Sequence, residues 1–538
     1  MDCFTVIVGK SASATGNVLV AHNEDDYLFV SLRHGYVPRT KWAEGVMLPA
    51  EQDCTPVPQI NETYGYYWTQ VRTPNGGLAT GDAFFNENGV CVVSDSSCGS
   101  HQDADEETHL PGICYELRRA IAERASSARH GLQIAIELVE EYGYNSPGRI
   151  YTIADANEAF MIQIVRGHRY IAARVPDDAV VIMPNHYTFH TLTDVPEMFY
   201  PDDIAAHAYE MGWLKEGEEF DFAKAYQDPK TYQIPVNTLR QDFATPMLTG
   251  TNPGGYPFCV KATRKISVKD LTKVLSTHYE GSEQDVRSGN GQSPHFTDVR
   301  RICVGSTVEA TVYELNEEPA RSTLWTAFGR PCELPFIPLH PLAGIAPSLN
   351  SLPAPLYAAE HHHDVLPRDV QYRKNDIWQQ FTDFENQLDA LYCREIAGVT
   401  ALKEQLFEQM EQNPVSDEQQ LRYALEELQT YAREHFNTIP LQIDAACADS
   451  KGFTVSFETE LPIKADSVVL YGRYNIFHAG LSGELQQDGS VYTARFEFEE
   501  PPFKAAGTGE YELFISALTT EDVPICGSSL IKVEADSE

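Results

Sequence analysis

The segment CFTVIVGKSASATGNVLVAHNEDD, residues 3–26, is the most informative part of this chain. An apolar run, Phe4 to Val8, precedes a stretch rich in Gly, Ser, Ala and Thr that ends at Gly16, and a second apolar run leads into the polar residues 22–26. Two short apolar runs separated by turn residues are typical of a β-hairpin. We therefore expect Cys3 at the start of a buried strand, with the polar cluster returning beside it.

Strand and helix signals continue through residue 183. A turn at 86–89 separates two apolar stretches within 81–94 and predicts a second strand pair. Apolar residues at helical spacing predict a helix from Ile113 to Tyr142, with Gly143 as its C-cap. Short apolar segments separated by turns then predict a four-stranded meander, at 149–153, 159–165, 170–173 and 180–183.

The second half of the chain is less regular. Residues 190–260 show no clear period and are expected to be long connections packed on the core. A helix is expected over 266–279, where Ser267 and Asp270 form a capping-box variant, followed by strands at 299–304 and 309–314. The pattern is helical from 369 to 436, with an interruption at 413–414 and a restart at Ser416 capped by Gln419, which predicts an antiparallel helix pair.

Three parts are expected along the chain. Residues 3–365 form the main α+β domain, 366–438 a helical hairpin segment packed on it, and 439–538 a small all-β, sandwich-like domain, because short alternating stretches follow Pro440. A chain of 538 residues is long enough for about three domains at roughly 150 residues each.

Charge excludes several classes of function. Forty Lys and Arg against 78 Asp and Glu leave a net charge of −38, which repels phosphate backbones and anionic membranes. No segment has the roughly 18 consecutive apolar residues of a membrane span, and the N-terminus lacks a signal-peptide pattern. We therefore expect a cytoplasmic protein that binds neither nucleic acid nor membrane; the sequence is compatible with a homo-oligomer.

Motifs of common catalytic machineries are missing from the sequence. It holds no P-loop, dinucleotide fingerprint, G-x-S-x-G or H-E-x-x-H. The eleven Cys are scattered without a C-x-x-C pair or zinc-ligand spacing, and most are interpreted as small buried residues in a reducing compartment. Residues 360–364, Glu-His-His-His-Asp, are a weak metal candidate because three adjacent His cannot all point one way. No metal site and no cofactor are therefore expected.

Cys3 is the exception among the cysteines. If Met1 and Asp2 were removed, Cys3 would carry a free α-amine, whose pKa of about 7.7–8.0 lies close to that of a thiol near 8.5. The amine can then take the thiol proton at neutral pH, so that one residue is both nucleophile and base. From position alone, a small buried residue is the more common interpretation.

The sequence around Cys3 resembles the N-terminal-nucleophile cysteine dipeptidases, the dipeptidase A family related to secernins. The likeness covers roughly residues 3–435. Beyond the opening segment it includes FNENGV at 85–90, residues 112–143 with ELVEEYG, IADANE at 153–158, RVPDD at 174–178 with NHY at 185–187, RKISV at 264–268 through HYEG at 278–281, and residues 325–338. Several independent blocks in the right order make it specific.

This resemblance implies a fold and a reaction. The fold is an Ntn-hydrolase αββα sandwich, two stacked antiparallel sheets between helix layers, and the reaction is metal-free, cofactor-free hydrolysis of the amide bond of dipeptides. Cys3 matches the nucleophile, Asp25 the aspartate that holds the α-amino group, and Asn185 the asparagine that helps to bind the oxyanion. His22, Asn23 and Arg264 match supporting or substrate-binding positions; for Arg264 a surface ion pair is an equally good interpretation.

Two departures from the family pattern stand out. His22 occupies a position where relatives usually have Arg, so a permanent cation beside the thiol is in doubt. Asp2 disfavours ordinary removal of Met1, so release of Cys3 is expected to need self-cleavage of the Asp2–Cys3 bond.

Two other functions remain open from the sequence. One is an acylase of the penicillin V or bile-salt type, which shares the nucleophile and the Asp and Asn positions but cleaves linear amides with a bulky acyl group. The other is a non-enzymatic, secernin-like protein, favoured if Cys3 is never released.

Overall fold

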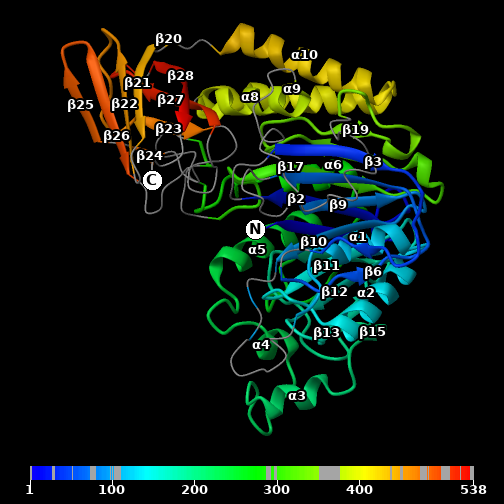
Figure 1. Ribbon diagram of the computed structural model, residues 1–538. Helices are drawn as coiled ribbons and strands as arrows, with labels where there is room; N and C mark the ends of the chain where they lie inside the picture. Colours follow the sequence, from blue (N-terminus) through cyan, green and yellow to red (C-terminus); the bar gives the residue numbers. More distant parts are fainter. Residues whose placement is uncertain are drawn as a thin grey trace.

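The computed structural model describes residues 3–26, 31–50, 53–72, 80–96, 99, 101, 111–285, 293–295, 300–349, 376–389, 391–436, 439–440, 442–448, 452–472, 481–482, 484–497, 509–521 and 523–533. Met1, Asp2 and the His-rich segment 360–364 therefore lie outside the described residues. The main body is formed by two antiparallel sheets that lie face to face, with helices on both outer faces (Figure 1).

The first sheet contains the N-terminal hairpin at its centre. Its order is β16-β14-β1-β2-β17-β18-β19. These strands are β1 (Phe4–Val8), β2 (Leu19–Asp25), β14 (Ala179–Met183), β16 (Val260–Lys261), β17 (Thr307–Glu314), β18 (Thr323–Ala327) and β19 (Ile337–Leu339). The predicted hairpin is confirmed, with Thr5 opposite His22 and Val8 opposite Leu19.

The second sheet has the order β15-β13-β12-β11-β10-β9-β8-β3. Its strands are β3 (Ser31–Val37), β8 (Tyr66–Arg72), β9 (Thr80–Asn86), β10 (Cys91–Ser96), β11 (Arg149–Ala154), β12 (Ala159–Ile164), β13 (Tyr170–Arg174) and β15 (Met198–Phe199). Two short pairs lie outside both sheets: β4 (Thr40–Lys41) with β7 (Glu62–Thr63), and β5 (Met47–Leu48) with β6 (Val57–Pro58).

Both faces of the second sheet are buried, as a four-layer arrangement requires. Tyr66 and Trp68 of β8 belong to the cluster beneath α1 (Glu116–Arg124) and α2 (Ala128–Tyr142), whereas Tyr67 between them belongs to the core shared with the first sheet. Successive side chains of a strand point to opposite faces, so one strand contributes to two cores. On the other side, α5 (Pro235–Thr249) and α6 (Val268–Leu275) cover the first sheet. The predicted αββα sandwich is thus confirmed.

Some predicted elements are wrong in extent or partner. The helix predicted over 113–142 is two helices, because Ser127 caps α2 by accepting a hydrogen bond from the His130 backbone N–H. The fourth strand of the predicted meander, β14, pairs with β1 in the other sheet. Residues 300–304, predicted as part of a strand, form a loop.

Residues 190–260 contain more regular structure than the predicted connections. They include α3 (Ile204–Glu210), α4 (Phe222–Tyr226) and the 15-residue α5. Pro246 within α5 and its polar residues hid the helical pattern, because Pro removes a backbone donor. The helix predicted over 266–279 is the shorter α6, and its Ser267–Asp270 capping box is confirmed.

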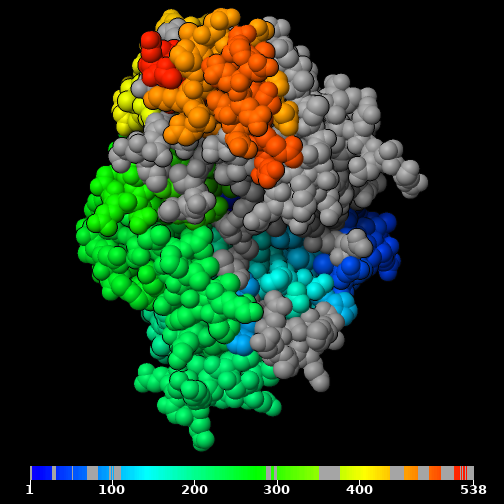
Figure 2. Space-filling model, turned by 90° about the vertical axis from the view of Figure 1, so that its left-hand side faces the viewer, coloured from blue at the N-terminus to red at the C-terminus, as the bar shows by residue number. Residues whose placement is uncertain are grey.

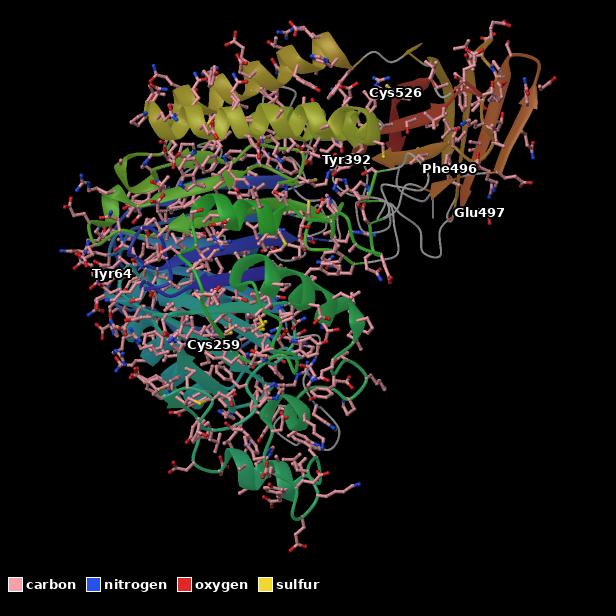
Figure 3. The ribbon with its side chains drawn as sticks, turned by 180° about the vertical axis from the view of Figure 1, so that it is seen from behind. Tyr64, Cys259, Tyr392, Phe496, Glu497 and Cys526 are labelled. Atoms are coloured by element: carbon pink, nitrogen blue, oxygen red, sulfur yellow. The ribbon has the colours of Figure 1, made fainter. Side chains whose placement is uncertain are left out.

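The helical segment contains three described helices, not a pair: α8 (Ile377–Asp389), α9 (Tyr392–Gln412) and α10 (Asp417–His435). The capping box of Ser416 and Gln419 is confirmed. Figure 3 shows α9 and α10 side by side, with Tyr392 at the end of α9 nearest the C-terminal strands. The two longest of these helices, α9 and α10, pack against β19 at the edge of the first sheet.

The C-terminal strands form two further sheets, of order β20-β28-β27-β23-β24 and β21-β22-β26-β25. They are β20 (Ile439–Pro440), β21 (Gln442–Ala448), β22 (Gly452–Glu458), β23 (Val469–Gly472), β24 (Leu481–Ser482), β25 (Glu484–Asp488), β26 (Val491–Glu497), β27 (Gly509–Leu518) and β28 (Pro524–Val533). Both sheets contribute buried side chains: Phe457 and Phe496 lie on β22 and β26 of the second of these sheets, and Ile515 lies on β27 of the first. Figure 2 shows these strands in orange at one end of the molecule. No helix among the described residues is long and apolar enough to cross a membrane.

Candidate active site

Cys3 directly precedes β1, the strand that pairs with β14 on one side and with β2 on the other. In the sheet β1 is flanked by β14 and β2, with Thr5 opposite Met183 on one side and Phe4 opposite Asn23 on the other. Continuing the register with β2 places Cys3 beside Glu24, and on the other side Arg240 donates to the carbonyls of both Cys3 and Pro184, the residue before Asn185. The Cys3 side chain is fully buried.

A chain of hydrogen bonds runs from the thiol into the sandwich. Cys3 Sγ donates to Glu24 Oε2 at 3.6 Å, and the same oxygen lies 3.1 Å from His22 Nε2. His22 Nδ1 lies 2.8 Å from Thr5 Oγ1, whose hydroxyl donates to Asp95 Oδ2 at 2.7 Å. The five side chains that these hydrogen bonds connect are all buried.

The directions of these bonds fix the protons. Because the Thr5 hydroxyl donates to Asp95, its oxygen accepts from His22 Nδ1–H. Burial lowers the pKa of His22, so the ring is neutral and its Nε2 is an acceptor. The partner that donates to Nε2 is then a protonated Glu24, whose pKa is raised well above its usual range by burial and by the nearby Asp26.

Buried charges around Cys3 act in opposite directions on its thiol. Burial raises the pKa of Cys3 well above its usual range, and the carboxylates of Asp95 and Asp25 add to this shift. Arg149, at the start of β11, opposes it. Arg149 binds Ser94 Oγ through Nε at 3.2 Å and is itself fully buried. Formation of a thiolate here therefore needs a further positive charge or a nearby base.

Asp25 and Asn23 tie the hairpin to the loop before β17. Arg300 donates to Asp25 Oδ2 at 2.5 Å, and Thr307 Oγ1 donates to Oδ1 at 2.5 Å. The Asn23 amide donates to the carbonyls of Leu275 and Ile302, both at 3.0 Å. Asn23 thus holds the C-terminal end of α6 and the loop around Ile302 against β2. Arg300 and Thr307 orient the Asp25 carboxylate.

Asn185 follows β14 and Pro184 in a left-handed backbone conformation, with φ 66°. Asn adopts this region more readily than most residues. Arg240 of α5 fixes the local geometry, since it donates to the carbonyl of Cys3 at 3.0 Å and to that of Pro184 at 2.9 Å. Asn237 donates to the Asn185 carbonyl at 3.4 Å.

Five of the six predicted site residues thus belong to three adjacent strands or directly adjoin them: His22, Asn23 and Asp25 lie on β2, Cys3 precedes β1, and Asn185 follows β14 and Pro184. Arg264 lies elsewhere, on the surface after β16, where it forms a bidentate ion pair with Asp270 at 2.9 and 3.0 Å. Its side chain is 44% exposed, which matches the surface ion pair that the sequence also allowed.

The sequence analysis missed the residues that surround this group: Thr5, Glu24, Asp95, Arg149, Arg240, Arg300 and Thr307. Glu24 was visible as a charge inside the hairpin, and Asp95 as a charge two residues after Val93, the last apolar residue of β10. Such charges in strand segments are signals of a buried polar site. The three arginines come from separate elements, and no local pattern distinguishes them from surface arginines.

Two groups of side chains in the described residues have donor atoms close enough for a metal and include cysteine. One consists of Cys3, His22 and Glu24, with atoms within 4.8 Å of one another. These three residues are the ones joined by the hydrogen bonds at the Cys3 thiol. The second group lies around His295 and is described below.

Comparison with known proteins adds independent findings. The sequence model of a protein family described as "Peptidase family C69" matches residues 2–350. A probable dipeptidase of Latilactobacillus sakei is 24% identical over 360 residues, which cover 62% of this chain and 73% of that protein. A probable dipeptidase of Salmonella dublin is 26% identical over 355 residues, 63% of this chain and 80% of that protein.

Among solved structures, the chain is similar to penicillin V acylase from Agrobacterium tumefaciens, with a TM-score of 0.31 and 11% identity, covering 63% of this chain and 86% of that one. It is also similar to a mutant of conjugated bile acid hydrolase from Clostridium perfringens, with a TM-score of 0.30 and 11% identity, over 60% and 88% of the two chains.

Proposed function

The chain belongs to peptidase family C69, and on this premise we propose that it hydrolyses dipeptides through Cys3 as an N-terminal nucleophile. The observation that carries the proposal is the position of the Cys3 thiol, buried at the head of β1 between Glu24 and the strand that leads to Asn185. The family match begins at residue 2, directly before this cysteine.

Catalysis requires a base for the Cys3 thiol. Removal of Met1 and Asp2 supplies the α-amine of Cys3, which is the nearest base that a one-residue mechanism offers. The raised pKa of the buried thiol supports this requirement, because the thiol remains protonated until such a base takes its proton. Asp25, oriented by Arg300 and Thr307, then stabilises the ammonium form of the amine.

The thiolate attacks the carbonyl carbon of the dipeptide, and the carbonyl oxygen becomes an oxyanion. The Asn185 side chain donates a hydrogen bond to this oxygen; one such preorganised donor contributes about 3–4 kcal/mol to transition-state stabilisation. The α-ammonium of Cys3 protonates the departing amine, which leaves a thioester on Sγ. Water then hydrolyses the thioester, with the α-amine again acting as base.

A substrate panel tests the proposal. The purified protein should hydrolyse unblocked dipeptides, and Cys3→Ala should abolish this activity. Cys91→Ala, a truncation of another buried cysteine in β10, is the matched control and should retain it. Dipeptide hydrolysis that survives Cys3→Ala would overturn the proposal, as would cleavage confined to penicillin V and bile-salt conjugates.

The setting of the enzyme is part of the same proposal. The nine cysteines whose side chains the structure describes are not in disulfide bonds, which supports a reducing, cytoplasmic environment. The division at 3–365, 366–438 and 439–538 also remains a proposal, since the first boundary falls among residues that are not described.

A further inference from the structure

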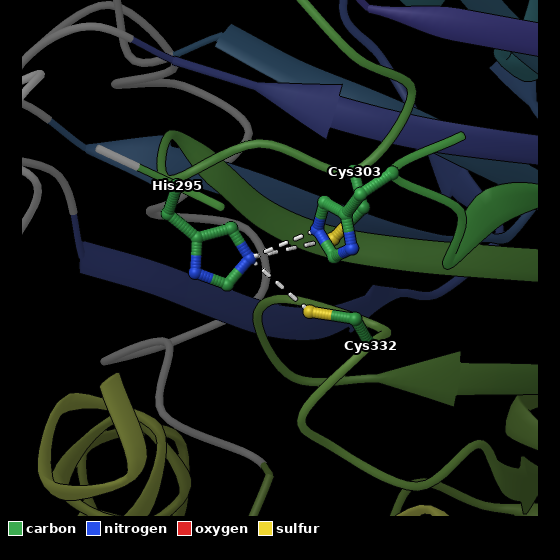
Figure 4. Close-up of side chains that lie close together, drawn as sticks. His295, Cys303 and Cys332 are labelled. Carbon is green, nitrogen blue, oxygen red and sulfur yellow. Dashed lines mark hydrogen bonds between the residues drawn. The ribbon is translucent and has the colours of Figure 1, made fainter. Parts of the chain in front are cut away.

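A second cluster of buried side chains lies away from Cys3 and has no part in the proposed reaction. It consists of His278 after α6, His295, Cys303 in the loop before β17, and Cys332 in the loop before β19. One nitrogen or sulfur atom of each of the four residues lies within 4.8 Å of the others, and all four are buried. Figure 4 shows Cys303 and Cys332 on the side of the His295 ring that carries Nε2.

The distances within the cluster come within about 0.5 Å of those between the ligands of one tetrahedral ion. His295 Nε2 lies 3.2 Å from His278 Nε2, 3.2 Å from Cys332 Sγ and 4.0 Å from Cys303 Sγ. Bond lengths of 2.0–2.1 Å to nitrogen and 2.3 Å to sulfur give ligand separations of about 3.3 Å between two nitrogens and about 3.5 Å between nitrogen and sulfur at a tetrahedral zinc.

Both histidines present Nε2 to the cluster because carboxylates bind their other nitrogen. His295 Nδ1 lies 2.7 Å from Asp389 Oδ1, and His278 Nδ1 lies 3.3 Å from Glu280 Oε1. A ring that donates Nδ1–H to a carboxylate can offer Nε2 as its ligand atom. The 3.2 Å contact between the two Nε2 atoms is a hydrogen bond when one of them carries a proton, and a bound Zn²⁺ would take the place of that proton.

The Asp389 carboxylate that binds His295 Nδ1 is held in place by two further residues. Ser293 donates to Asp389 Oδ1 at 2.6 Å, and Arg330 lies 2.7 Å from Oδ2. Such a carboxylate–histidine pair is the arrangement that orients ligands in zinc sites. Cys332 also lines a cavity of about 360 Å³ between α6 and α9, which provides a path for an ion.

We propose that His278, His295, Cys303 and Cys332 bind one Zn²⁺ ion in a closed, structural site. Two thiolates balance the charge of the ion, and the S₂N₂ donor set in tetrahedral spacing is typical of zinc. Four protein ligands leave no open position for substrate, so the ion has a structural role. No spacing in the sequence indicates this site, because the ligands come from separate loops.

The site fastens the loop that orients Asp25. Cys303 lies in the segment that carries Arg300 and Thr307, both of which donate to Asp25. His278 and Cys332 tie this segment to the end of α6 and to the loop before β19. Loss of the ion should therefore loosen the loop and lower the thermal stability of the protein, whatever reaction occurs at Cys3.

Zinc content tests the proposal independently of activity. After dialysis of native protein against EDTA, mass spectrometry of metals should find one zinc per chain. Cys332→Ala and Cys303→Ala should each lower zinc content severalfold and lower the melting temperature, whereas the matched control Cys91→Ala should keep one zinc. A wild-type protein without zinc, or one that retains zinc in both variants, would overturn the proposal.

A second measurement uses only the wild-type chain, so it does not depend on variants that fold. Addition of a mercurial to native protein should release one zinc to a chromogenic chelator as the thiols are modified. Cobalt introduced in place of zinc should give the visible absorption and sulfur charge-transfer bands of a tetrahedral thiolate site. A disulfide between Cys303 and Cys332 in peptide maps of native protein would contradict the proposal.

Discussion

Replacing Glu24 by Gln tests the protonation pattern beside Cys3. Glu24 Oε2 lies 3.1 Å from His22 Nε2, and the raised pKa of Glu24 and lowered pKa of His22 favour a protonated Glu24 beside a neutral ring. A Gln amide has the same shape and can donate to the same nitrogen, so the substitution keeps the hydrogen bond. The opposite arrangement, an ionised Glu24 paired with a charged His22, would lose a buried ion pair.

The two arrangements predict effects of different size. Exchange of one neutral hydrogen-bond donor for another changes stability by about 1 kcal/mol or less. Removal of one partner from a buried ion pair costs about 3–5 kcal/mol. At about 2 °C per kcal/mol for a large domain, we expect Glu24→Gln to melt within about 2 °C of the wild type at pH 5, against a loss of at least about 6 °C for the ion pair.

The pH dependence has a definite sign. The pKa of Glu24 is raised in the folded protein above its ordinary value of 4.5, so the folded state holds a proton that the unfolded state releases. Wild-type stability is therefore lost as pH rises above about 4.5 toward the folded pKa, by up to about 1.4 kcal/mol per pH unit. Gln does not titrate, so Glu24→Gln should become more stable than the wild type between pH 5 and pH 8.

Differential scanning calorimetry at both pH values measures this difference. Glu123→Gln is the matched control, because Glu123 is equally buried but forms an ion pair with Arg119 at 2.8 Å. This control should lose several degrees at both pH values. A Glu24→Gln variant that behaves like the control, or whose deficit grows with pH, would refute the assignment of a proton to Glu24.

Three further substitutions separate the roles of the other site residues. Asn185→Gly should lower kcat about 10²–10³-fold at unchanged stability, because Gly accepts the positive φ of this position. Asn185→Ala should lose the same activity and also stability. An Asn185→Gly variant with the kcat of the wild type would remove Asn185 from the site. Asp25→Asn should move the acidic limb of kcat/KM to lower pH and reduce kcat, measured in a His22→Gln background; an unmoved limb with a normal rate would contradict its role. Arg264→Ala should leave kcat/KM unchanged and cost less than about 1 kcal/mol of stability, because its ion pair with Asp270 is exposed; a large fall in kcat would restore it to the site.

Local features of the fold were predictable from the sequence, and long-range ones were not. The hairpin of β1 and β2 follows from two apolar runs and a turn, and both capping boxes follow from residues three positions apart. The placement of β14 beside β1 depends on pairing between segments far apart in the chain, and the sequence instead suggested a continuous meander. Strands that follow one another in the sequence often pair in the sheet, but they do not always do so.

The same distinction applies to the site. Cys3, Asp25 and Asn185 were found through a resemblance that assigns them positions, and the two sheet registers explain why they meet. Arg240 and Arg300 reach the site from α5 and from a loop, so only the tertiary structure reveals them. The cluster at His295 was hidden for the same reason, because its ligands lack the close pairs that mark zinc sites in sequences.

The N-terminal residue of the active enzyme tests the central claim most directly. Active protein, quantified by its turnover of dipeptides, should be sequenced from its N-terminus and compared with a Cys3→Ala variant prepared in parallel. We expect active material to begin with Cys3, because only a free α-amine can serve as the base. Fully active protein that begins Met-Asp-Cys would contradict the account, since the amide nitrogen between Asp2 and Cys3 cannot accept the thiol proton.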